Sequence, residues 1–126
     1  MLLMNFAKRF EQSLGNYDPN TTQDNGRNAT KITSQGKSAT VYTDMVERFP
    51  TEVDVMLSNE NDNKFVIYET DLDEKDLEEE VIEITSVIKD YIADRYTLRS
   101  TGFIKKQATL EFRAGDRIIF ASQSKK

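Results

Sequence analysis

Residues 73–95 read DEKDLEEEVIEITSVIKDYIADR, and this stretch decides the fold because it predicts one long amphipathic helix. Its apolar residues recur at spacings of three and four, which places them on one stripe of a helix. They are Leu77, Val81, Ile84, Ile88, Tyr91 and Ile92. Asp73 occupies the N-cap position, and Asp76 three residues later forms a weak version of a capping box.

The opposite face of this helix is predicted to be strongly acidic. It carries Asp76, Glu79, Glu83, Asp90 and Asp94, and Glu78 and Glu80 add to the negative field. Like charges spaced i,i+4, such as Glu79 and Glu83, destabilise a helix by about 0.2–0.5 kcal/mol per pair. Two interpretations stay open: a solvated face that favours solubility, or a surface that binds a basic partner.

Charge is segregated along the chain, although the net charge is only −5. Residues 1–43 carry a net +2, residues 44–94 a net −13, and residues 95–126 a net +6. The candidate basic partner-binding residues are Arg95, Arg99, Lys105, Lys106, Arg113 and Arg117. Two interpretations fit an acidic middle beside a basic end. The charges pair within the fold, or they pair between neighbouring subunits.

The first half of the chain is predicted to contain two short helices around a long polar segment. Residues 2–14 have helical apolar spacing, with Phe6 and Phe10 as core residues or as a hook for another subunit. Residues 15–39 are rich in Asn, Thr, Ser and Gln and are expected to form a long polar loop or arm. Residues 41–49 show helical spacing up to Pro50, which predicts the short middle helix, although residues 40–43 could instead form a strand.

The other segments alternate as strands do. Residues 53–57 and 65–69 predict a β-hairpin around a polar loop, and residues 97–104 look extended. Residues 107–113 and 117–121 predict a second hairpin, whose return strand is apolar on both faces and is expected to be buried on both. The resulting fold is a single α+β domain over residues 1–126, with two layers. About five mainly antiparallel strands are covered on one face by the N-terminal, short middle and long central helices.

Composition excludes several chemistries. The chain has no cysteine and no histidine, so thiolate metal sites, zinc sites and the usual nucleophilic triads are absent. We therefore assign no catalytic, cofactor-binding or metal residue and predict a protein that is not an enzyme. The N-terminal apolar run is too short for a signal peptide or a membrane span. We expect an intracellular (cytoplasmic) protein or part of an assembled particle, with no membrane partner.

Three functions agree with these patterns. The first is a non-enzymatic protein-binding or assembly subunit that forms homo-oligomers or docks into a larger complex, such as a ring component of a virus particle. The second is an acidic inhibitor or regulator that occupies a basic surface of another protein. The third is a nucleic-acid or phosphate-binding module that uses the basic C-terminal strands, with Tyr96 and Phe103 as stacking aromatics.

Overall fold

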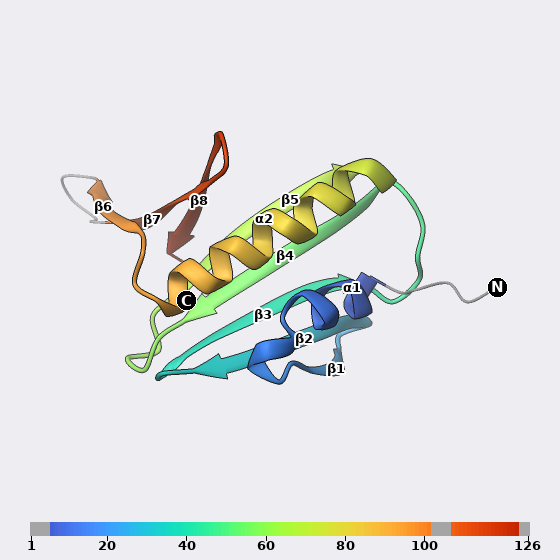
Figure 1. Ribbon diagram of the computed structural model, residues 1–126, viewed down its shortest axis with the longest axis horizontal. Coiled ribbons are helices and arrows are strands. Elements are labelled where there is room, and N and C mark those ends of the chain that lie inside the picture. The colour runs from blue at the N-terminus through green and yellow to red at the C-terminus, as the bar shows by residue number, and fades with distance from the viewer. Residues whose placement is uncertain (1–5, 102–106, 124–126) are drawn as a thin grey trace.

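A computed structural model describes residues 6–101 and 107–123 (Figure 1). Two α-helices are present in this part of the chain, α1 (Phe6–Ser13) and α2 (Glu74–Ile92), with a 3₁₀ turn at Gly15–Tyr17. The strands are β1 (Asn20–Asp24), β2 (Arg27–Ser34), β3 (Lys37–Asp44), β4 (Thr51–Ser58), β5 (Lys64–Leu72), β6 (Thr97–Thr101), β7 (Gln107–Ala114) and β8 (Arg117–Gln123).

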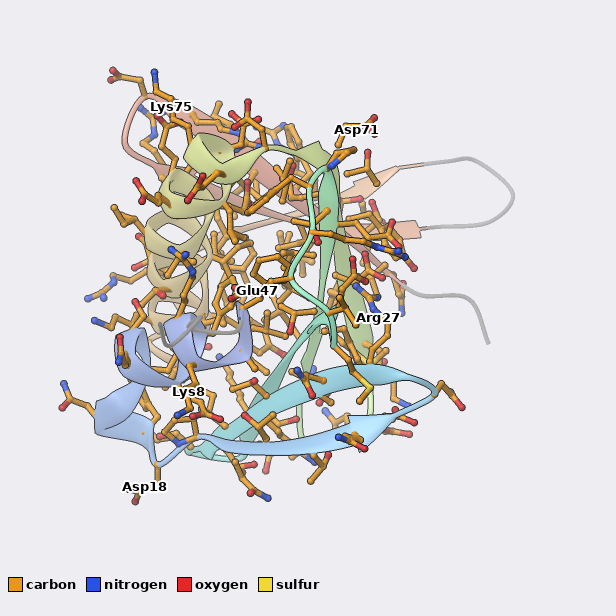
Figure 2. All side chains as sticks on the ribbon, turned by 90° about the vertical axis from the view of Figure 1, so that its right-hand side faces the viewer. Lys8, Asp18, Arg27, Glu47, Asp71 and Lys75 are labelled. Atoms are coloured by element: carbon orange, nitrogen blue, oxygen red, sulfur yellow. The ribbon has the colours of Figure 1, made fainter. Side chains whose placement is uncertain are left out.

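The strands form one antiparallel sheet in the order β1-β2-β3-β4-β5-β8-β7-β6. Figure 1 shows α2 lying along β4 and β5 and α1 lying over β2 and β3, and Figure 2 shows both helices on the same side of the sheet. The broad α+β class holds. The prediction of about five strands and three helices is wrong, because the described chain has eight strands and two α-helices.

Most of the missing strands lie in residues 15–39, the segment expected to be a polar loop or arm. It forms the 3₁₀ turn, β1, β2 and the start of β3. Asn25-Gly26 and Gln35-Gly36 take positive φ angles of 51°, 77°, 53° and 78°, as the two-residue turns of β-hairpins require. Threonine and other polar residues satisfy strand geometry at a sheet edge, where few apolar positions are needed.

The middle helix predicted over residues 41–49 is also absent. Residues up to Asp44 belong to β3, and a connection through Pro50 leads to β4. The buried residues of β3 are Ala39, Val41 and Thr43, which alternate in a strand-like way. A short apolar run that contains β-branched residues is compatible with both the helical period of about 3.6 and the strand period of about 2. Pairing with β2 and β4 makes this segment a strand.

The core lies between the two helices and the sheet. Phe6 and Phe10 of α1 are fully buried, which confirms their expected core role. The predicted central helix is confirmed as α2, and Leu77, Ile84, Ile88 and Tyr91 are at most 1% exposed. Over the residues the structure describes, neither helix has the length and hydropathy needed to cross a membrane.

The start of α2 has the predicted capping box. The Asp76 amide donates to Asp73 Oδ1 at 2.8 Å, and the Asp73 amide donates to Asp76 Oδ2 at 3.2 Å. We expect Asp73→Ala to lower the free energy of unfolding by about 1 kcal/mol, because it leaves the Asp76 amide without its acceptor. Urea denaturation followed by circular dichroism measures this loss. The control is Glu78→Ala, an exposed acid inside α2 that takes no part in the cap, and an equal loss for both variants would contradict the capping role.

The return strand β8 is buried on only one face. Ile119 and Ala121 face the helices and are buried, whereas Ile118 and Phe120 are 46% and 52% exposed. The prediction of burial on both faces is wrong, because among the described residues no helix covers the second face of the sheet.

The join between β5 and β8 is the weakest in the sheet. Among the residues that the structure describes, these strands pair at two positions, Phe65 with Gln123 and Val66 with Ser122, whereas the other neighbouring strands pair at five or more. The β8–β7–β6 group therefore has a short backbone connection to the rest of the sheet and depends on side chains for its placement.

Candidate protein-binding groove

A groove lies between α2 and the turn that joins β7 to β8. Its walls are residues 114–117 on the turn side and Glu79, Ile82, Glu83 and Ser86 on the helix side, and it has a volume of about 510 Å³. Three of the sequence-predicted partner-binding residues meet here: Glu79 and Glu83 from the acidic set and Arg117 from the basic set. We call this feature the α2/turn groove.

The α2/turn groove combines an apolar surface with acidic side chains. Ile82 is 71% exposed and is the large aliphatic side chain among the groove residues. Glu79 and Asp116 are exposed, and neither has an ion pair among the described residues. An apolar group flanked by free carboxylates fits a segment that carries apolar and basic side chains together.

Arg117, which lines this groove, is the centre of a charge cluster. Its Nη2 donates to Glu69 Oε1 on β5 at 2.7 Å, and its Nη1 donates to Glu83 Oε2 on α2 at 3.1 Å. The same Nη1 lies 3.6 Å from Glu80 Oε2. Burial alone would lower the pKa of Arg117, but the three carboxylates raise it overall, so this arginine stays charged.

Two members of this cluster, Glu80 and Glu69, were not among the predicted partner-binding residues, and Glu80 was expected only to add to the negative field of the exposed face of α2. Glu80 is 3% exposed, and its Oε1 has no hydrogen-bond partner among the described residues. Burial, followed by repulsion from Glu69, raises the pKa of Glu80 to about 7, against the opposing effect of Arg117. The signal was present in the sequence, because position 80 lies three residues after Leu77 and four before Ile84, on the apolar stripe.

The other predicted acidic residues lie away from the groove. Asp76 is used by the helix cap. Asp90 accepts a hydrogen bond from Arg95 Nε at 3.1 Å, and Asp94 pairs with Lys37. Lys37 also donates to the Tyr91 carbonyl at 2.7 Å, so it joins the start of β3 to the end of α2. The acidic face of α2 is therefore partly neutralised by cations of the same chain.

The predicted basic residues are likewise mostly paired within the molecule. Arg95 and Arg117 bind the acids just described, and Arg99 Nε donates to Glu111 Oε1 at 2.8 Å between β6 and β7. Arg113 is exposed and has no ion pair among the described residues. Lys105, Lys106 and Phe103 lie outside the described residues. Of the two interpretations of the charge segregation, pairing within the fold accounts for Arg95 and Arg117.

Two further observations bear on the alternatives. Tyr96, expected to be a stacking aromatic, packs against Tyr91 and Phe112 with ring centroids 5.7 and 5.6 Å apart. Within the described ranges, Asp and Glu side chains do not gather in threes in an arrangement that could hold a metal ion.

The sequence did not indicate an exposed apolar group on the helix-free face of the sheet. Tyr68 of β5 is 66% exposed and lies on the face that also presents Ile118 and Phe120 of β8. The registers of β4, β5 and β8 place these side chains on one face, which no sequence period could reveal before the strand order was known.

Comparison with known proteins gives no relative, because neither a protein-family model, nor a curated protein, nor a solved structure matches this chain.

Proposed function

We propose that this chain is a non-enzymatic protein-binding subunit that self-associates head to tail. In this arrangement the α2/turn groove of one copy takes a basic, apolar segment from the C-terminal region of the next. A contact between two different surfaces repeats from copy to copy and builds a ring when its rotation closes.

The observation that carries the proposal is the composition of the α2/turn groove. Exposed Ile82 lines the same groove as the free carboxylates of Glu79 and Asp116, and the groove has a volume of about 510 Å³. The C-terminal region supplies complementary chemistry: Arg113 is exposed on β7, and residues 102–106 read Gly-Phe-Ile-Lys-Lys. Apolar contact would provide affinity, and the charges would fix orientation and partner choice.

The nucleic-acid alternative has less support. Three of the four described basic residues in the C-terminal region are bound to carboxylates, which reduces the positive charge available to phosphate groups. The inhibitor alternative uses the same α2/turn groove with a different protein as occupant. It becomes the preferred function if the isolated chain does not self-associate.

The test is size-exclusion chromatography with light scattering at low and high salt. We expect the wild-type chain to be larger than a monomer at low salt and to dissociate as salt screens the contact. Glu79→Lys should weaken association about tenfold or more, because it places a cation beside the basic segment. The control is Glu78→Lys, an exposed acid on α2 outside the groove, which should associate like wild type.

The outcomes separate the functions. A chain that is monomeric at every salt concentration rules out head-to-tail assembly. Association that survives Glu79→Lys unchanged would mean that another surface carries it, with the exposed residues Tyr68 and Phe120 as the next candidates.

A further inference from the structure

Arg117 connects three elements at the point where the sheet is least continuous. It begins β8, whereas the two β5–β8 pairs of the described residues lie at the other end of that strand, at Ser122 and Gln123. Its guanidinium binds Glu69 of β5 and Glu83 of α2. At this end of β8, the side-chain contacts of Arg117 replace the missing backbone pairing between β5 and β8.

The charges around Arg117 do not balance when every group is ionised. The charged groups that bear on Glu80 are Glu69 from β5, Arg117 from β8 and Glu83 one turn along α2. One arginine therefore faces three carboxylates, and the most buried of them, Glu80, has an oxygen without a hydrogen-bond partner in the described part of the chain. A proton on Glu80 removes one buried negative charge and leaves Arg117 with two carboxylates that it contacts directly.

We propose that Glu80, Glu69, Glu83 and Arg117 form a proton-operated latch that holds the start of β8 against α2 and β5. The latch is closed when Glu80 carries a proton and loosens when Glu80 is ionised. Arg117 and Glu83 also line the α2/turn groove, so the latch would regulate that groove. This regulatory role rests on the proposed function, whereas the latch itself does not.

The pH dependence of the latch follows from the difference in the pKa of Glu80 between the closed and open states. Glu80 holds its proton up to about pH 7 in the closed structure, but only up to about pH 4.5 when exposed to water. Opening therefore releases a proton between these values, and opening becomes easier as pH rises through 7. The sequence contains no histidine or cysteine, so apart from a chain-terminal amine Glu80 is the group in the described chain expected to titrate near neutrality.

Amide hydrogen exchange tests the latch in the intact chain. After correction for the intrinsic pH dependence of exchange, residues 117–121 should lose protection about tenfold or more between about pH 5.5 and pH 8.5. Glu80→Gln, which keeps the shape and removes the charge, should hold protection nearly constant over this range. Glu78→Gln, an exposed control on the same helix, should behave like wild type.

A second measurement needs no variant. The carboxyl carbon of Glu80, followed by NMR in the wild-type chain, should titrate near pH 7, and a midpoint near 4.5 would overturn the latch. An identical pH dependence of exchange in wild type and Glu80→Gln would overturn it as well. If exchange shows the predicted change while light scattering finds no association, the latch stands and the proposed function fails.

Discussion

Phe10→Ala is expected to lower the free energy of unfolding by about 3–5 kcal/mol, the usual loss for a large aromatic residue removed from a core. Phe10 is fully buried, and α1 packs over β2 and β3, where Ile32 and Val41 are also buried. The eight residues of α1 that the structure describes are too few to form a stable helix in isolation. Loss of the ring should therefore release the helix and expose this end of the core.

Urea denaturation of Phe10→Ala beside Phe49→Ala measures the effect. Phe49 lies 40% exposed with its ring centroid 5.5 Å from that of Phe6, so its removal should cost about 1 kcal/mol or less. Equal losses in the two variants would show that α1 does not contribute to the core. In that case the alternative interpretation of this helix, a hook for another subunit, would regain support.

The parts of the fold that were predictable are those with a strong and unambiguous period. The apolar stripe of residues 77–92 predicts α2, and the capping pair Asp73 and Asp76 predicts its start. The alternating residues of β4, β5 and β7 predict strands because one face of each is buried and the other is not. In these segments local pattern and tertiary burial agree.

The strands in residues 15–44 were not predictable from hydrophobic pattern because they bury few large side chains. Ile32 and Val41 are the large aliphatic residues of β2 and β3, and the other inward positions hold small or hydroxyl side chains such as Ala39 and Thr43. Alternation of Thr with Lys or Asn resembles a polar loop when only hydropathy is considered. The Asn25-Gly26 turn was the better signal, because this dipeptide favours a two-residue hairpin.

The site was predicted in residue type but not in arrangement. Periodicity identifies Glu79 and Glu83 as one acidic face of α2, yet it cannot show that Arg117 returns from β8 to bind Glu83 and Glu69. That contact depends on the position of β8 next to β5 in the strand order, a long-range property of the sheet. The burial of Glu80 was missed, because its charge was counted with the acidic face although its spacing from Leu77 and Ile84 places it on the apolar stripe.

Arg117→Met is expected to have the second large effect, and its size should depend on pH. The substitution leaves Glu69, Glu80 and Glu83 without their common cation, and removing one partner from a buried ionic group is strongly destabilising. Because the Arg117 side chain is 46% exposed, we reduce the usual figure and expect a loss of about 2–3 kcal/mol at about pH 8.5.

At about pH 5.5 the same substitution should cost only about 1 kcal/mol, because Glu80 then carries a proton and the remaining repulsion is between Glu69 and Glu83. The free energy of unfolding of the wild-type chain should also fall between about pH 5.5 and pH 8.5, but by less than that of Arg117→Met. Because the pKa of Glu80 is raised in the folded chain, its contribution to the free energy of unfolding is fully present below about pH 4.5 and is lost as pH rises through about 7. Chemical denaturation of the wild-type chain and of Arg117→Met, each at both pH values, measures the four free energies of unfolding.

Arg113→Met is the matched control for this experiment. Arg113 lies on β7 opposite Ile118, is exposed, and has no ion pair among the described residues, so its replacement should change stability by about 0.5 kcal/mol or less at either pH. If Arg117→Met costs the same at both pH values, then Glu80 is ionised in both conditions and the charge cluster does not take up a proton near neutrality. If Arg117→Met costs no more than Arg113→Met, the contacts of Arg117 with α2 and β5 contribute little to stability. In that case the short β5–β8 pairing and the burial of Ile119 and Ala121 must hold β8 in place.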